Sequence, residues 1–213
     1  MEIFAAAEAF AKEKLHTFDA GHDWTHTERV RNLAGHIQQE ENAGDPEIVR
    51  LAAILHDIAD TKFHQGAETD GGDMAYIFLT ARGFSADQSE HVRKIINHLS
   101  FKHHMEKHPL DTIEFHIVQD ADRLDAMGAI GIARAFHYGG YKNRALYDPE
   151  VAPRRYKSAE EYKKSDAPTI NHFYEKLFLL KDLMNTATGK KLAQERHAYM
   201  IAFVERFKKE WEG

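Results

Sequence analysis

Cysteine is absent from this sequence of 213 residues. Its absence excludes disulfide bonds, a thiolate nucleophile and zinc sites built on cysteine. Histidine, carboxylate and water remain as the ligands that a metal ion could find in this chain. A protein without cysteine also suits a reducing compartment, so we expect a cytoplasmic location.

Long apolar runs are missing as well. No apolar stretch is long enough to cross a bilayer, which requires about 20 consecutive apolar residues. The first segment, MEIFAAAEAFAKEKL, carries acidic residues early, where a secretory signal would be basic. Its pattern is typical of an amphipathic helix. We therefore expect neither export nor a membrane partner.

An excess of positive charge is the third missing feature. The chain has 28 lysines and arginines against 34 aspartates and glutamates, a formal net charge of −6. Broad binding to nucleic-acid backbones depends on clustered lysine and arginine. A nucleic-acid polymer is therefore not an expected partner, although a local basic pocket is compatible with this charge.

Histidine, by contrast, is abundant. Fifteen histidines are spread along the chain, and they do not form a tag-like run. This number directs attention to metal or proton chemistry. The length and the composition, 43% hydrophobic and 29% charged, are typical of one globular domain with a sizeable core.

The spacing of apolar residues predicts an all-α fold. Apolar residues recur every three or four positions through nearly every segment, and none shows the sustained alternation of a half-buried strand. We expect a single helical domain whose oligomeric state the sequence does not indicate. The predicted helices cover about residues 2–17, 23–42, 46–60, 73–82, 85–99, 111–137, 167–187 and 190–211.

Several helix ends carry recognisable signals. The second helix begins near Asp23 or Thr25, and Thr25 has the spacing of a capping box with Glu28. Ser85 and Gln88 have the same spacing. Asp45 before Pro46 predicts an N-cap. Gly83 lies at a predicted helix end, and Gly128 lies inside a long helical pattern. Residues 61–72 and 139–166 look irregular. The second segment is long for a plain connection, so it is either a lid or a surface excursion.

A histidine and an aspartate stand side by side in the third predicted helix, in the sequence LAAILHDIAD. Adjacent helical residues point about 100° apart, so His56 and Asp57 can reach one ion only if it lies beside the buried side of the helix. An ionised aspartate in apolar surroundings is costly unless it is paired or bound to metal. His26, in HDWTHTERV, and Asp122, in QDADRLDAMG, lie on separate predicted helices that can converge on the same cavity.

This order of residues resembles the HD-domain phosphohydrolase superfamily, in which one histidine, a His-Asp doublet and a distant aspartate follow one another. The matching residues are His26, His56 with Asp57, and Asp122 in an Ala-Asp-Arg-Leu context. The resemblance covers about residues 20–140, and the remainder, about 141–213, is similar to a helical extension in a bacterial subgroup of such hydrolases. It implies an HD-type helical bundle with the metal between core helices.

The final carboxylate has competitors. Asp120 and Asp125 lie on either side of Asp122, and the family context favours Asp122, with Asp125 as the reserve. Two imidazoles and two carboxylates form a mixed nitrogen and oxygen site, which suits Mn²⁺, Mg²⁺, Fe²⁺, Co²⁺ or Ni²⁺. The sequence does not choose among these ions. Structural tetrahedral zinc fits less well, because such sites usually include cysteine.

A divalent ion can lower the pKa of its bound water from about 15.7 towards about 7 and can neutralise phosphoryl oxygens. The hypothesis is that this water attacks phosphorus. Asp60 lies one helical turn beyond the doublet and could orient or deprotonate the water, as an acidic residue at this offset does in some relatives. Arg29, one turn after His26, and Lys62 are the preferred phosphate contacts, although each alone could be a solvated surface charge.

A second group of histidines, His98, His103 and His104, falls between the doublet and Asp122. In some HD-domain branches this region supplies a second metal, whereas in a mononuclear site His98 would contact the substrate. Further along, His172 and Lys176 are four residues apart on a predicted helix. They form either a wall of the pocket or a surface pair.

The function that these residues favour is metal-dependent hydrolysis of a phosphate ester or anhydride. The expected partner is a small phosphorylated substrate, namely a nucleotide or a related metabolite. Two alternatives stay open at this point. One is a di-iron oxygenase on the same type of scaffold, and the other is a non-catalytic sensory module that binds metal and nucleotide.

Overall fold

A computed structural model of the chain describes residues 2–15, 23–59, 70–99, 110–156 and 165–213. These residues form helices and contain no strand, so the all-α prediction is confirmed. The chain divides into two compact units, Met1–Asp122 and Arg123–Gly213, and the division falls inside one helix, α6 (Ile113–Asp125). We refer to them as the N-terminal and C-terminal units. The predicted single domain, with a core at about 20–140 and an extension at about 141–213, stays a prediction.

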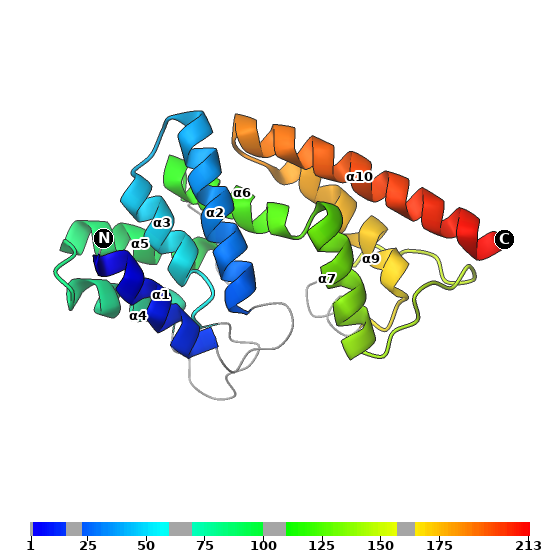
Figure 1. Cartoon of the computed structure of the whole chain (residues 1–213), viewed down its shortest axis with the longest axis horizontal. Coiled ribbons are helices and arrows are strands. Elements are labelled where there is room, and N and C mark those ends of the chain that lie inside the picture. Colours follow the sequence, from blue (N-terminus) through cyan, green and yellow to red (C-terminus); the bar gives the residue numbers. More distant parts are fainter. Residues whose placement is uncertain (1, 16–22, 60–69, 100–109, 157–164) are drawn as a thin grey trace. The chain divides into compact units, whose positions relative to one another are not determined.

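The N-terminal unit is built around α3. This helix packs against α1, α2 and α5, and α4 packs on α5 (Figure 1). Seven of its residues, from Ile48 to Leu55, are buried, because its sequence is apolar on nearly every side. The helices of this unit are α1 (Glu2–Leu15), α2 (Trp24–Glu41), α3 (Pro46–Leu55), α4 (Gly71–Thr80), α5 (Ala86–Leu99) and most of α6.

Two of the predicted helix caps are present and one is wrong. Asp45 caps α3 by accepting hydrogen bonds from the backbone N–H groups of Glu47 and Ile48. Ser85 accepts a hydrogen bond from the backbone N–H of Gln88 at the start of α5.

Of the two predicted starts of α2, Asp23 is confirmed, and the capping box of Thr25 with Glu28 is wrong. Asp23 is the N-cap of α2, and the hydroxyl of Thr25 donates to the Asp23 carboxylate at 2.7 Å. An aspartate accepts more strongly than a threonine hydroxyl at this position, and as N-cap it begins the helix two residues earlier than Thr25 would.

The C-terminal unit contains α7 (Gly128–Tyr141), α9 (Thr169–Glu175), the 3-10 helix η2 (Leu177–Leu183) and α10 (Ala187–Glu212). Helix α10 packs against α7 and η2. Aromatic rings from α7, α9 and α10 meet in the core of the C-terminal unit. The ring centroids of Phe136, Phe173 and Phe203 are 5.9–6.2 Å apart there.

Two long predicted helices are each divided in the structure. The pattern from 111 to 137 breaks between α6 and α7, where Gly128 has φ +70°. The pattern from 167 to 187 breaks at Lys176, whose φ of −142° and ψ of −56° are not helical, and it continues as η2. Apolar periodicity alone did not reveal these breaks, because it is kept on both sides of each.

The first three residues of the segment predicted to be irregular, 139–141, belong to the end of α7. Residues 61–69 and 157–164 lie outside the described part of the chain. None of the helices in the described part has the length and apolar character that a membrane span requires.

Candidate metal centre

Helix α2 places His26 in its first turn, on the buried side. The Asp23 carboxylate accepts a hydrogen bond from the backbone N–H of His26 at 2.9 Å, which fixes the start of the helix directly before this histidine. The His26 residue is only 2% exposed. Burial and capping together leave the imidazole little freedom of orientation.

We predicted that the His-Asp doublet lies inside a helix. In the structure it lies at the end of one. Helix α3 stops at Leu55, His56 is its C-cap, and Asp57 follows in a turn. The 100° separation of adjacent helical side chains therefore does not apply to this pair. The turn allows both side chains to approach the same histidine of α2.

The helix end also orients the His56 ring. The last carbonyl groups of a helix have no partner inside the helix. One of them, the carbonyl oxygen of Ala53, lies 2.8 Å from Nδ1 of His56. This contact makes Nδ1 the donor, so Nε2 carries the free electron pair of the neutral ring.

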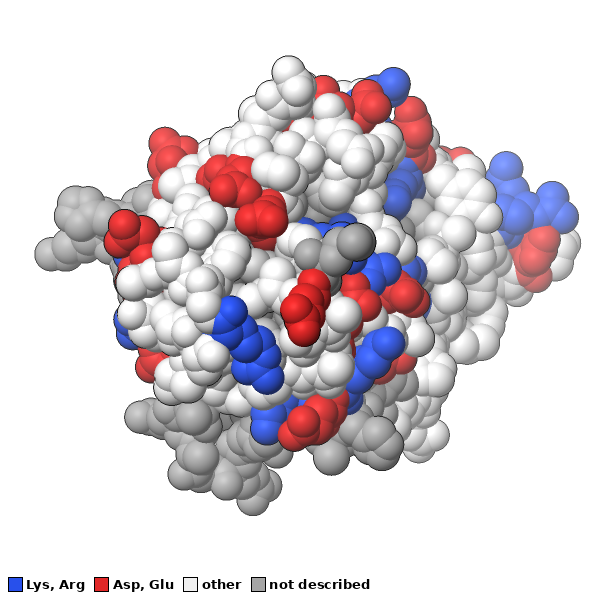
Figure 2. Space-filling model, turned by 60° about the vertical axis from the view of Figure 1, so that its left-hand side comes forward, with Lys and Arg blue, Asp and Glu red and all other residues white. Residues whose placement is uncertain are grey.

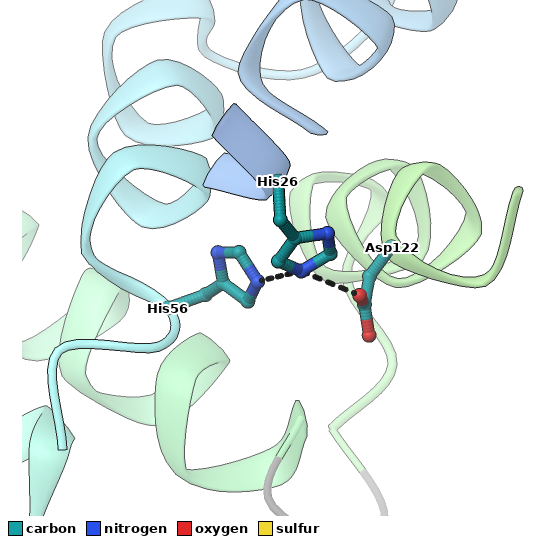
Figure 3. Close-up of side chains that lie close together, drawn as sticks. All are labelled: His26, His56 and Asp122. Atoms are coloured by element: carbon teal, nitrogen blue, oxygen red, sulfur yellow. Dashed lines mark hydrogen bonds and ion pairs between the residues drawn. The ribbon is translucent and has the colours of Figure 1, made fainter. Parts of the chain in front are cut away.

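Four side-chain atoms from α2, the turn after α3, and α6 meet at one point. Nε2 of His26 lies 3.3 Å from Nε2 of His56 and 3.4 Å from Oδ1 of Asp122 (Figure 3). Oδ2 of Asp57 is 3.5 Å from the Nε2 atoms of both histidines. Metal–ligand distances of about 2.1 Å separate neighbouring ligand atoms by roughly 3.0–3.5 Å, so these spacings fit one shared ion.

Among the described residues, one group of histidines and carboxylates has ligand atoms that all lie within 4.8 Å of one another. It consists of His26, His56 and Asp122. Asp57 joins it through its contacts with both histidines. The donor set, two imidazole nitrogens and two carboxylates, is that of a divalent cation without sulfur ligands. The residues present therefore fit a divalent metal ion. This donor set does not distinguish one divalent metal from another.

Burial differs among the four side chains. Those of His26 and His56 are 2% and 3% exposed, that of Asp57 is 18% exposed and that of Asp122 is 42% exposed. Solvent and a small substrate can therefore approach the cluster beside Asp122. Partial desolvation acts to raise the pKa of the Asp122 carboxyl, but the hydrogen bond with His26 and the charges of His56 and His26 outweigh it and hold this pKa below its ordinary value.

The structure distinguishes the three neighbouring aspartates of α6. Asp122 approaches His26, whereas Asp125 is 3% exposed and paired with Arg134. Asp120 is fully buried. It is thus Asp122, and neither of its two competitors, that belongs to the metal-sized group of the described residues.

The predicted substrate contacts have other contacts in the structure. Arg29 donates to Oγ1 of Thr25 at 3.3 Å. His98, on α5, lies 2.7 Å from the carbonyl oxygen of Lys94 and edge-on to the ring of Phe115. Their roles at a substrate stay predictions. The remaining candidates, Asp60, Lys62, His103 and His104, lie outside the described residues.

His172 and Lys176 do not share one regular helix, because α9 ends before Lys176. His172 is half-buried, and burial together with the positive charges of Lys176 and Arg144 lowers its pKa to about 3. It is therefore neutral at physiological pH. The sequence spacing gave no sign of this environment.

An all-helical chain with two histidines and two aspartates at one point has the features of an HD domain, and the family model described as HD domain matches residues 23–127. The protein YpgQ of Bacillus subtilis is 39% identical over 196 residues, which cover 91% of this chain and 86% of YpgQ. The chain belongs to the HD-domain family.

Solved structures agree with this assignment. An HD-superfamily hydrolase from Bacillus thuringiensis has a TM-score of 0.78 and 40% identity, with 100% of this chain and 98% of that chain covered. The crystal structure of Bacillus subtilis YpgQ in complex with ADP has a TM-score of 0.78 and 35% identity, with coverages of 98% and 95%. The fold is that of HD-superfamily hydrolases along nearly the whole chain.

Proposed function

We propose that this protein is a metal-dependent phosphohydrolase that cleaves a phosphate ester or anhydride in a nucleotide or a related small phosphorylated metabolite. The observation that carries the proposal is the convergence of His26, His56, Asp57 and Asp122 at distances that suit one divalent ion. The hydrolase description of the Bacillus thuringiensis relative supports the reaction class, and the ADP complex of YpgQ supports a nucleotide as substrate.

In this proposal the four side chains hold Mn²⁺, Mg²⁺, Fe²⁺, Co²⁺ or Ni²⁺. When bound, such an ion supplies a water of lowered pKa and neutralises charge on phosphoryl oxygens. The Ala53 carbonyl keeps the His56 ring in the tautomer that presents Nε2. Asp57 reaches both histidines and so contributes a carboxylate at the reacting centre.

The reaction forms a bond from a water oxygen to phosphorus and breaks the bond from phosphorus to the leaving oxygen. Asp60 would accept the proton of the water, and Arg29 and Lys62 would neutralise charge on the phosphate. His98 would contact the substrate or, with His103 and His104, hold a second ion. These roles rest on sequence position and on the family resemblance.

The surface charge supports a small substrate over a polymer. Lysine and arginine side chains are interspersed with aspartate and glutamate on the face that Figure 2 shows. A nucleic-acid polymer would require a continuous basic surface. We therefore propose a small phosphorylated molecule as the partner. The proposed cytoplasmic location rests on the absence of cysteine.

The test is hydrolysis by the full chain after its metal has been removed with a chelator and each candidate ion added back. ADP, ATP and other nucleotides are offered, and the products are separated by chromatography so that phosphate and pyrophosphate are both detected. We expect hydrolysis with at least one ion and loss of about 10²-fold or more in Asp57→Ala. Asp111→Ala, whose side chain is 88% exposed, is the matched control and retains activity.

Two results would contradict the proposal. One is a wild-type protein that binds metal and releases no product from any nucleotide. The other is Asp57→Ala with wild-type activity. Two bound irons with a visible absorption band and no hydrolysis would instead favour the di-iron oxygenase.

A further inference from the structure

Glu114 links the beginning of α6 to the beginning of α3. Its carboxylate oxygen Oε1 accepts a hydrogen bond from the backbone N–H of Asp45, the N-cap of α3, at 2.9 Å. Both helices lead to candidate ligands. Helix α3 ends directly before His56, and Asp122 follows Glu114 by about two turns on α6. All four residues lie in the N-terminal unit.

The Glu114 hydrogen bond completes the cap of α3 from outside that helix. In a capping box, the third helical residue returns a side-chain acceptor to the N–H group of the N-cap residue. The third residue of α3 is Ile48, which has no side-chain acceptor. Glu114 supplies the missing acceptor from α6, and its negative charge at this helix start interacts favourably with the helix dipole. The start of α3 therefore depends on a side chain of another helix.

Further contacts hold the Glu114 side chain in place. It is only 12% exposed, and its second oxygen, Oε2, lies 3.7 Å from Nε2 of His91 on α5. The same nitrogen is 3.3 Å from Oγ1 of Thr112, directly before α6. The connection between α2 and α3 also lies against Glu114, since a Cβ at Gly44 would be 3.4 Å from its Cγ and its Oε1. The first turn of α6 is thus attached to α5 and to the start of α3.

Helix α6 transmits this attachment to the candidate metal centre. Between Glu114 and Asp122 the helix has three fully buried apolar residues, Ile117, Val118 and Ala121. Their burial keeps one side of α6 in the core, but the hydrophobic effect is non-directional. A hydrogen bond, by contrast, defines a distance and a direction. The Glu114 contact therefore restricts the position of α6 along its axis more closely than the apolar contacts do.

We infer that Glu114 is a positioning residue, which sets α6 against α3 so that the Asp122 carboxylate meets His26 and the doublet at one ion. Metal–ligand distances tolerate deviations of only about 0.2 Å, so a shift of α6 by about 1 Å is enough to lose this ligand. The 3.4 Å approach of Asp122 to His26 depends on the position of α6 in the same way. This inference rests on the metal site of the proposed function.

The experiment measures the Mn²⁺ affinity of the full chain from the electron paramagnetic resonance signal of free Mn²⁺, at a temperature at which circular dichroism shows each variant to be folded. Glu114→Met keeps the length of the side chain and removes the carboxylate acceptor. We expect Mn²⁺ binding to weaken about 3- to 30-fold, the range for residues that act on a site without touching its ligand. Glu114→Gln keeps an oxygen that can accept from Asp45 and should recover most of the affinity.

Glu8 offers a matched control in the same unit. Its Oε1 lies 2.7 Å from Nη1 of Arg31 on α2 and 3.4 Å from Nη2 of Arg50 on α3, and its side chain is 22% exposed. It is thus another partly buried carboxylate that joins helices. It belongs to α1, which carries none of the candidate ligands. Glu8→Met should therefore lower the thermal stability, as Glu114→Met does, and leave the Mn²⁺ affinity at the wild-type value.

A double-mutant cycle tests whether Glu114 acts through Asp122. In an Asp122→Ala background the ion keeps the two histidines and Asp57, and Glu114→Met should have no further effect on Mn²⁺ affinity. A variant that merely loosened the fold would lower the affinity in both backgrounds. If Glu114→Met does not fold, Glu114→Ala takes its place in the cycle.

Three results would overturn the inference while the proposed function stands. They are wild-type affinity in folded Glu114→Met, no recovery in Glu114→Gln, and an equal loss in the Asp122→Ala background. A loss in Glu8→Met as large as that in Glu114→Met would also overturn it. A wild-type chain that binds neither Mn²⁺ nor any other candidate ion would overturn both, so the wild-type titration tells the two failures apart.

Discussion

Nδ1 of His56 lies 2.8 Å from the carbonyl oxygen of Ala53, and this contact links the end of α3 to the orientation of an imidazole. The carbonyl accepts from Nδ1 because α3 ends at Leu55 and leaves it without a helical donor. Nε2 is then turned to His26, 3.3 Å away. The end of α3 thus helps to set the geometry of the candidate metal centre.

Replacing His56 should remove the metal without unfolding the chain. His56→Ala deletes one nitrogen ligand, and we expect Mn²⁺ affinity to fall by about 10²-fold or more, since each lost ligand costs several kcal/mol. The measurement is metal bound per chain after equilibrium dialysis. His36→Ala, a change at an exposed histidine of α2, should bind metal like wild type. Equal metal content in the two variants would show that His56 is not a ligand.

Asp23 should stabilise the helix that carries His26. Asp23→Ala removes the acceptor of the His26 backbone N–H, and loss of an N-cap costs about 0.5–2 kcal/mol of stability. Asp23→Asn keeps an acceptor and should lose much less. Urea unfolding of the metal-free proteins checks this order, and an alanine variant as stable as the asparagine variant would contradict the capping role.

Two glycines of the N-terminal unit should respond in opposite directions to alanine. A Cβ at Gly72 would meet the side chain of Asn97 at 2.0 Å and the backbone oxygen of Arg93 at 2.7 Å, so α4 and α5 would have to separate. We expect Gly72→Ala to lose about 1–3 kcal/mol of stability.

A Cβ at Gly35, inside α2, meets nothing within 4 Å. Gly35→Ala should therefore gain about 0.5–1 kcal/mol through helix propensity. Thermal melts of both variants test the pair of predictions. A destabilised Gly35→Ala together with a tolerated Gly72→Ala would refute the packing described for these helices.

His172 should make stability depend on pH. Its folded pKa of about 3 lies below the ordinary value of 6.5, so between these values the unfolded chain binds a proton at this position that the folded chain does not. The free energy of unfolding therefore falls as the pH falls from 6.5 towards 3, by up to about 1.4 kcal/mol per pH unit from this group. Above pH 6.5 the group contributes no pH dependence.

The corresponding measurement compares wild type with His172→Gln by urea unfolding at pH 7 and at pH 4.5. The variant cannot take up the proton, so its stability relative to wild type should increase as the pH is lowered. A difference between the two proteins that is the same at both pH values would contradict the lowered pKa of His172.

The order of the candidate ligands could be predicted because His26, the doublet and Asp122 follow one another as in the HD-domain family that the sequence resembles. The N-cap at Asp45 could be predicted from the sequence itself, since it depends on two adjacent residues, Asp45 and Pro46. The approach of Asp122 to His26 is consistent with the preference for Asp122 over its two neighbours.

The end of α3 could not be predicted from the same signals. Ile58 is buried, so the apolar pattern continues past the last helical residue, Leu55. The bond between the His56 side chain and the Ala53 carbonyl lies at this helix end, and apolar periodicity does not predict it. The contact of Arg196 with the Leu124 carbonyl could not be predicted either, because the two residues are 72 positions apart in the sequence.

The most direct test follows nucleotide hydrolysis and metal occupancy together in one sample. Chelator-stripped wild-type protein is titrated with Mn²⁺ in the presence of ADP or ATP, and bound Mn²⁺ and released product are measured at each step. The account predicts that hydrolysis starts from background and rises in proportion to occupancy, and that Asp57→Ala shows neither at the same Mn²⁺ concentrations. Hydrolysis that is already complete in the stripped protein, or full occupancy with no hydrolysis of any nucleotide and any of the candidate ions, would contradict it.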